Sequence, residues 1–177
     1  MQKLVLITGA SSGIGQALAL QYAREGYRLA LLARRVDVIK SWLGPYAISA
    51  DSYCIYSADV SDASSMASAA QDCLMRQGVP DVVIANAGIS IGVDSSRRED
   101  IDVMARILAT NVVGMAATFG PFIDPMVARG SGTLVGIGSV AGIRGLPGHG
   151  GYCASKAAVI SYCESLRGEL RSTGVKV

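Results

Sequence analysis

Short runs rich in valine, isoleucine and leucine alternate along this chain with longer segments whose apolar residues recur at helical spacing. Strands that are apolar on both faces, each followed by a helix, are typical of a parallel sheet covered by helices on both sides. The pattern predicts strands at residues 3–8, 28–33, 53–58, 81–85, 132–138 and 175–177, and helices at 13–24, 36–43, 62–77, 101–128 and 152–172. We therefore expect an α/β fold with a doubly wound, Rossmann-like parallel sheet whose strands lie in the order 3-2-1-4-5-6.

The length of 177 residues is natural for one domain, and neither a repeat nor a linker interrupts the alternation. Residues 1–177 are accordingly predicted to form a single domain. Its sixth strand is cut short at Val177, which would leave the edge of the fifth strand poorly protected. We therefore expect a C-terminally incomplete domain, with a natural polypeptide that continues beyond the printed sequence.

Charge, hydropathy and cysteine spacing argue against several classes of function. The net charge is +2 and most basic residues are scattered, so no nucleic-acid groove is expected. No uninterrupted apolar run approaches the ~18 residues of a membrane span, and no secretory signal is visible before the first strand. The four cysteines show no metal-ligand spacing and are accompanied by a single histidine, so we expect no metal site, reduced thiols and a cytoplasmic protein.

The first predicted strand runs into a glycine-rich turn, TGASSGIG at residues 8–15, and then into a helix. Glycines let the backbone turn sharply and approach a pyrophosphate, whose charge is stabilised at a helix N-terminus. The sequence contains no GxxxxGK[ST] motif, which excludes a nucleoside-triphosphate P-loop. The turn thus predicts dinucleotide binding, and a tight helix cap is the alternative. The residues expected to contact the cofactor here are Gly9, Ser11, Ser12, Gly13, Ile14 and Gly15.

The same turn also matches GxSxG, the nucleophile elbow of α/β-hydrolases, with Ser11 as the nucleophile. That elbow needs an oxyanion donor from an earlier loop, but only eight residues precede Gly9. We therefore keep the hydrolase only as a weak alternative.

The end of the second strand indicates which cofactor is used. An acidic residue about 20 positions beyond the glycines would bind the ribose 2′-hydroxyl of NAD, whereas arginine suits a 2′-phosphate. This chain has Arg34 and Arg35 there, and arginine makes bidentate, charge-assisted contacts to phosphate. NADP(H) is therefore favoured over NAD(H). The alternative is a solvated arginine pair that opens a helix, and the carboxylate of Asp37 is nearby.

Tyr152 and Lys156 lie four residues apart, on one face of a predicted helix. A phenol with an ordinary pKa of about 10 is a poor acid–base catalyst at neutral pH, but a cation about 4 Å away favours its ionised form. Ser139 ends the fifth predicted strand, at the edge where open α/β sheets bind ligands, and its hydroxyl could hold a substrate oxygen. Without these partners Ser139 would be read as a turn cap. Asn111 is a lone polar residue in an apolar helix, which favours a buried, hydrogen-bonded amide.

Together these motifs resemble the short-chain dehydrogenase/reductase family, and the TGxxxGxG spacing resembles its simple oxidoreductase branch. The resemblance covers the whole printed chain. It is carried by residues 8–15, Asp59-Val60, Asn86-Ala87-Gly88, Asn111, Ser139 and the YCASK segment at 152–156.

The resemblance implies a role for each of these positions. Tyr152 would give or take the substrate proton, Lys156 would activate Tyr152 and hold the nicotinamide ribose, and Ser139 would orient the substrate oxygen. Asn111 would support a water relay towards Lys156. Asp59 and Val60 would lie at the adenine, with Asn86, Ala87 and Gly88 as the floor of the cofactor cleft, and Tyr152 is also expected at the cofactor.

The resulting hypothesis is an NADP(H)-dependent oxidoreductase that transfers hydride between nicotinamide and a small or medium-sized, largely apolar carbonyl or alcohol. The resemblance also implies a homodimer or homotetramer that pairs through helices 101–119 and 152–172. A non-catalytic dinucleotide-binding sensor or scaffold is the alternative from another functional class.

Overall fold

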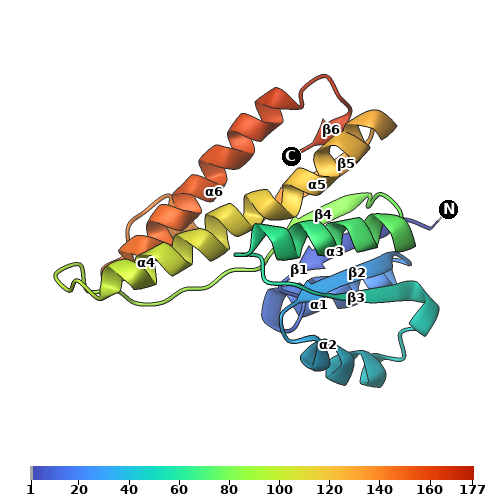
Figure 1. Cartoon of the computed structure of the whole chain (residues 1–177), viewed down its shortest axis with the longest axis horizontal. Coiled ribbons are helices and arrows are strands. Elements are labelled where there is room, and N and C mark those ends of the chain that lie inside the picture. The colour runs from blue at the N-terminus through green and yellow to red at the C-terminus, as the bar shows by residue number, and fades with distance from the viewer. Residues whose placement is uncertain (1) are drawn as a thin grey trace.

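The computed structural model describes residues 2–177, and its six strands form one fully parallel sheet (Figure 1). The strands lie in the order β3-β2-β1-β4-β5-β6. The predicted doubly wound α/β fold and its strand order are therefore confirmed. The strand bounds are β1 Leu4–Thr8, β2 Arg28–Ala33, β3 Tyr53–Ser57, β4 Val82–Ala85, β5 Gly132–Gly136 and β6 Val175–Lys176.

Helices cover the sheet on both faces because successive strand residues point to opposite sides. In β1, Leu4 and Leu6 belong to the core under α3, α5 and α6, whereas Val5 and Ile7 belong to the core under α1 and α2. The helix bounds are α1 Gly13–Arg24, α2 Val36–Leu43, α3 Ala63–Arg76, α4 Asp100–Leu108, α5 Gly114–Arg129 and α6 Gly150–Glu169. Short 3₁₀ segments η1 Gly44–Tyr46, η2 Ala50–Ser52 and η4 Val140–Gly142 and a π-helical segment η3 Ala109–Val113 complete the set.

Helix α3 is one residue shorter at each end than the predicted 62–77, and two other helices differ more from their predicted bounds. The helix expected at 101–128 is α4, η3 and α5 in succession, with a π-helical turn that no propensity rule indicated. The helix expected to begin at residue 152 begins at Gly150, because the carbonyl of His149 already accepts a hydrogen bond from the Cys153 N–H, 2.9 Å. It ends at Glu169 rather than at 172. Tyr152 therefore lies in the first turn of α6.

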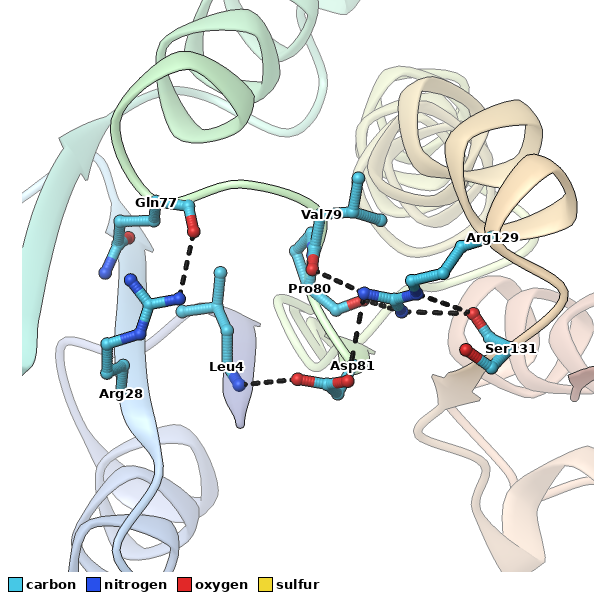
Figure 2. Close-up of polar contacts among 8 residues, drawn as sticks. All are labelled: Leu4, Arg28, Gln77, Val79, Pro80, Asp81, Arg129 and Ser131. Carbon is cyan, nitrogen blue, oxygen red and sulfur yellow. Dashed lines mark hydrogen bonds and ion pairs between the residues drawn. The ribbon is translucent and has the colours of Figure 1, made fainter. Parts of the chain in front are cut away.

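The edge of the sheet where the strands begin is held together by polar contacts around Arg129 (Figure 2). The guanidinium donates to the carbonyls of Val79, 2.8 Å, and Pro80, 2.6 Å, and to that of Ser131. It also lies 3.8 Å from the carboxylate of Asp81, which accepts a hydrogen bond from the N–H of Leu4. These contacts join the end of α5 to the starts of β1, β4 and β5, opposite the edge where ligands of such folds bind.

Within residues 2–177, the stretch Asp100–Arg129 is long and apolar enough to cross a membrane, by length and composition only. Core helices of soluble proteins meet the same criteria. Here Phe119, Phe122 and Met126 are fully buried in the core between this stretch and the sheet. The stretch therefore serves as part of the helical layer of the fold.

Candidate active site

The predicted site residues lie where the parallel strands end. Connections from β1 and β4, which are neighbours in the sheet, leave towards opposite faces, and such a switch point opens a crevice at the carboxyl edge. The glycine turn follows β1, the arginine pair follows β2, and Asp59 follows β3. Asn86 follows β4 and Ser139 follows β5, so one edge of the sheet carries all of these groups.

The glycine turn requires glycine at two positions where the backbone comes close to its neighbours. Gly9 has φ +67°, and a Cβ there would lie 2.8 Å from the Cα of Ala87. A Cβ on Gly15 would collide with the carbonyl oxygen of Gly9 and would lie 2.6 Å from the Asn86 amide nitrogen. The first turn of α1 therefore packs directly on the loop after β4.

Hydrogen bonds of Thr8 and Asn86 join the glycine turn after β1 to the loop after β4. The Thr8 hydroxyl accepts hydrogen bonds from the N–H groups of Asn86, 3.1 Å, and Ala87, 3.2 Å, and donates to the carbonyl of Ile84. In return, the Asn86 side chain donates to the carbonyls of Thr8, 3.0 Å, and Gly9, 3.4 Å. Thr8 is not among the site residues predicted from the sequence. The place of Thr8 at the head of TGxxxGxG was the available signal.

These loops enclose a cleft of about 380 Å³. Most of the predicted cofactor residues line it, namely Gly9, Ser11, Ser12, Ile14, Arg34, Arg35, Asp59, Val60, Asn86, Ala87 and Gly88. Four predicted cofactor residues do not line it: Gly13, which has φ +59°, and Gly15, which shape the turn, and Tyr152 and Lys156, which lie on α6. The cleft also takes in Leu32, Ala33, Ala58, Ile89 and Thr110, which sequence analysis missed. Small and apolar residues at strand ends carry no chemical signal that would single them out.

Arg34 and Asp59 face each other across this cleft. The guanidinium of Arg34 lies 3.5 Å from the carboxylate of Asp59, and its side chain is 70% exposed. Hydrogen bonds from the Ser61 hydroxyl, 2.7 Å, and from its backbone N–H, 3.0 Å, lower the pKa of Asp59, with a smaller contribution from Arg34. Asp59 is thereby kept anionic, and it holds the arginine at the mouth of the cleft.

Tyr152 and Lys156 share one side of α6. The Lys156 ammonium lies over the Tyr152 ring, 5.8 Å from its centroid, and donates a 2.6 Å hydrogen bond to the carbonyl of Ile137. Lys156 is only 7% exposed, and burial lowers the pKa of its amine. Among the described residues it has no carboxylate within ion-pair distance. The charge of Lys156 therefore lies near the Tyr152 ring with no anionic partner among the described residues.

Ser139 does not end the fifth strand as expected, because β5 stops at Gly136. Ser139 instead precedes η4, and its hydroxyl accepts a 3.1 Å hydrogen bond from the N–H of Ala141. The turn that it caps packs tightly on α6, since a Cβ on Gly142 would lie 2.7 Å from the carbonyl of Lys156. Ser139 therefore belongs to the same packed unit as Lys156, and its hydroxyl proton is free to be donated.

Asn111 lies in the π-helical turn and is 3% exposed. Its side-chain oxygen accepts from the N–H of Ile89, 2.8 Å, and its amide nitrogen donates to the carbonyl of Ile89, 2.9 Å, and to the Ser155 hydroxyl, 3.0 Å. The expected buried, satisfied amide is thus present. Both side-chain N–H groups are engaged, so a water relay through Asn111 would have to use an oxygen of this residue.

Apolar side chains surround this end of α6. Val140 is 73% exposed, Ile143 is 83% exposed and Leu146 is 45% exposed, all on the loop between Ser139 and Tyr152. Exposed apolar residues gathered on one loop are typical of a surface that binds something apolar.

The residues present fit a nicotinamide dinucleotide. The side chain of Ser12, the N-cap of α1, makes no capping hydrogen bond, so main-chain N–H groups at the start of this helix can approach a phosphate. The cleft then runs past the arginine pair and Asp59 on one side and reaches Ile89 and Thr110 on the other.

Comparisons with known proteins agree with this geometry. A family model for short chain dehydrogenases matches residues 3–177. The chain is 38% identical over 175 residues to an uncharacterized oxidoreductase of Myxococcus xanthus, and this match covers 99% of the chain and 69% of that protein.

The chain also superposes closely on solved structures. A short-chain dehydrogenase from Streptomyces avermitilis superposes with a TM-score of 0.91 at 32% identity, which covers 100% of this chain and 64% of that one. An alcohol dehydrogenase from the archaeon Thermococcus sibiricus, complexed with 5-hydroxy-NADP, superposes with a TM-score of 0.89 at 30% identity. This match covers 99% of the present chain and 75% of the alcohol dehydrogenase. The chain spans about two thirds of the length of these relatives. Because the family match extends over nearly every residue that builds the sheet and the cleft, the chain belongs to the short-chain dehydrogenase family of oxidoreductases.

Proposed function

We propose that the protein is an NADP(H)-dependent oxidoreductase that interconverts a carbonyl and an alcohol, with Tyr152 as the acid–base group. The observation that carries this proposal is the buried ammonium of Lys156, which lies over the Tyr152 ring and has no ion-pair partner among the described residues. An uncompensated cation stabilises the phenolate form of a neighbouring tyrosine, which makes proton exchange at neutral pH accessible.

In this proposal Tyr152, Ser139 and Lys156 each have a defined task in the reaction. When bound, the nicotinamide supplies the hydride for reduction and accepts it in oxidation. In reduction Tyr152 donates its phenolic proton to the substrate oxygen, and in oxidation the phenolate removes the alcohol proton. Ser139, whose oxygen already accepts from Ala141, donates its own hydroxyl proton to the same substrate oxygen. Lys156 stabilises the phenolate while its bond to Ile137 holds it in place.

NADP(H) is proposed as the cofactor because two arginines line the cleft beyond β2 and no carboxylate occupies the end of that strand. The 2′-phosphate would compete with Asp59 for Arg34, and Arg35 would remain as a second donor group. The structurally similar alcohol dehydrogenase from Thermococcus sibiricus was complexed with an NADP derivative, which supports the same choice here.

The substrate is proposed to be small to medium-sized and largely apolar, since Val140, Ile143 and Leu146 are exposed on the loop that joins Ser139 to Tyr152. A dinucleotide-binding sensor without catalysis is the second candidate. The intact set of Ser139, Tyr152 and Lys156 favours the enzyme.

A homodimer or homotetramer is proposed for the assembly. Ile101 is 65% exposed, Met104 39% and Val113 54%, all on the α4–η3 segment that packs against α6. Pairing of this surface with a second copy would bury these side chains, and light scattering of the purified protein tests it. The cytoplasmic location is likewise a proposal, which cell fractionation tests.

The function is tested by following NADPH absorbance with a panel of aromatic and aliphatic ketones and aldehydes. The proposal predicts cofactor oxidation and transfer of deuterium from C4-deuterated NADPH to the product carbinol carbon. NADH at equal concentration is expected to react more slowly. Tight NADPH binding with no turnover on any member of the panel would support the sensor instead.

A further inference from the structure

Ser155 has a fully buried hydroxyl that makes two hydrogen bonds to residues of the candidate site. It donates to the backbone carbonyl of Tyr152, 2.7 Å, and accepts from the side-chain amide of Asn111, 3.0 Å. Serine in a helix often donates to a carbonyl one turn back, so the first bond alone is ordinary. The second bond is not, because it crosses from α6 to the π-helical turn.

The connection continues from Asn111 into the cofactor cleft. Asn111 accepts from the N–H of Ile89 and donates to its carbonyl, in the loop after β4. Gly88, one residue earlier, is so close that a Cβ there would lie 3.2 Å from the Asn111 side-chain oxygen. Both Gly88 and Ile89 line the cleft. A chain of hydrogen bonds therefore runs from the cleft wall through Asn111 and Ser155 to the backbone of Tyr152.

No spare donor proton is left on the side chains of Ser155 and Asn111. The single proton of the Ser155 hydroxyl goes to Tyr152, and both side-chain N–H groups of Asn111 are engaged. Ser155 is 0% exposed and Asn111 is 3% exposed, so solvent is poorly placed to replace a lost bond. Removal of the hydroxyl would leave a buried N–H of Asn111 unpaired, and Asn111 would then rearrange or loosen its hold on Ile89.

We propose that Ser155 is a positioning residue, which sets the first turn of α6, and with it Tyr152, relative to the dinucleotide cleft by acting through Asn111. This inference rests on the proposed function for its catalytic consequence. Ser155 touches neither substrate nor cofactor, so its loss should misplace the acid–base group without removing any group that binds NADPH.

The sharpest test compares Ser155→Thr with Ser155→Val, because these side chains have the same shape and differ in whether they carry the hydroxyl. The threonine variant is expected to keep a kcat about tenfold above that of the valine variant, since small misplacements of reacting groups reduce rates by one to two orders of magnitude. The dissociation constant for NADPH should agree within about twofold between the two. Ser161→Ala, at an exposed position of the same helix, is the control and should match the parent. If both β-branched variants fail to fold, Ser155→Ala compared with Ser161→Ala takes their place.

Amide hydrogen exchange gives a second readout that does not depend on turnover. The N–H of Ile89 should exchange faster in the valine variant than in the threonine variant, whereas the N–H of Leu31 in β2 should be unchanged. Equal kcat in the two variants would overturn the positioning role, and equal exchange at Ile89 would overturn the route through Asn111. If the parent turns over no carbonyl at all, the proposed function fails, while exchange at Ile89 still decides whether Ser155 controls the cleft loop.

Discussion

The ammonium of Lys156 lies over the ring of Tyr152, 5.8 Å from its centroid, and is anchored by a 2.6 Å hydrogen bond to the carbonyl of Ile137. One buried cation is thus fixed between the end of β5 and the first turn of α6. Desolvation makes this charge costly to the fold, and the same desolvation strengthens its field at the phenol. Stability and the proposed function therefore oppose each other at this residue.

Lys156→Met is expected to lower turnover by about 10²-fold or more, because the phenolate loses its stabilising charge. Burial lowers the pKa of Lys156 below its ordinary value of 10.5, so the folded state loses this proton at lower pH than the unfolded state. The unfolded state then binds more protons in the interval below 10.5, and the parent should gain stability relative to Lys156→Met as the pH rises towards that value. Urea unfolding of both proteins across this pH range measures the difference.

Lys40→Met is the control for this experiment, since the Lys40 side chain is 64% exposed on α2. Its unfolding free energy should follow that of the parent at each pH. A pH-independent difference between the parent and Lys156→Met would show that the lysine is not held in a desolvated site.

Gly15→Ala should damage the cofactor site. Its new methyl group would meet the Gly9 carbonyl oxygen and lie 2.6 Å from the Asn86 amide nitrogen, so the glycine turn must move away from the loop after β4. Overpacking of this kind costs about 1–3 kcal/mol of folding free energy, and NADPH affinity should fall at the same time. Thermal melting with and without NADPH measures both effects.

Gly168→Ala is the matched control, because a Cβ at this helical position of α6 would meet nothing within 4 Å. It should raise stability by about 0.5–1 kcal/mol through helix propensity and leave NADPH binding unchanged. Equal behaviour of the two alanine variants would contradict the close packing between the two loops.

Arg35→Ala and Arg34→Ala test the choice of cofactor. Loss of a charge-assisted contact to the 2′-phosphate should raise the NADPH dissociation constant about 10- to 100-fold for at least one of the two, with NADH affinity changed by less than about threefold. Fluorescence titration with each cofactor gives the values, and Arg24→Ala on α1 is the control. If NADPH and NADH affinity fall by the same factor, the arginines do not read the 2′-phosphate.

Arg129→Met addresses the opposite edge of the sheet (Figure 2). It removes donors to the carbonyls of Val79, Pro80 and Ser131 and the partner of Asp81. We expect a loss of about 2–3 kcal/mol in unfolding free energy, as for other broken hydrogen-bond networks, and unchanged NADPH affinity at temperatures where the variant is folded. A stability within 0.5 kcal/mol of the parent, roughly the scatter of neutral surface substitutions, would contradict this assignment.

The strand order and the positions of most elements were predictable because β-strand runs such as 28–33 are apolar on both faces and are separated by helical periodicity. The helix ends were less predictable. Gly150 and Gly151 suggested a loop, yet the tertiary packing of α6 against α4 extends the helix through them. The π-helical turn at Ala109–Val113 has no signature in a stretch composed of apolar and small residues.

The site residues with distinctive chemistry, such as Tyr152, Lys156 and the glycines, could be proposed from their motifs, the predicted elements around them and the family resemblance. The arrangement of these residues relative to one another could not be predicted from the sequence. Neither the anchoring of Lys156 by a backbone carbonyl nor the pairing of Arg34 with Asp59 follows from sequence distance. Ser155 belongs to the YCASK segment, but no role was predicted for it from the sequence, and only the structure brings it to Asn111.

The most direct test of the account is the turnover of Tyr152→Phe measured beside that of Tyr162→Phe, which changes another tyrosine of the same helix. The account predicts that Tyr152→Phe lowers kcat by about 10²- to 10⁴-fold while it binds NADPH as the parent does, and that Tyr162→Phe keeps its activity. Full NADPH-dependent turnover by Tyr152→Phe would contradict the proposed chemistry.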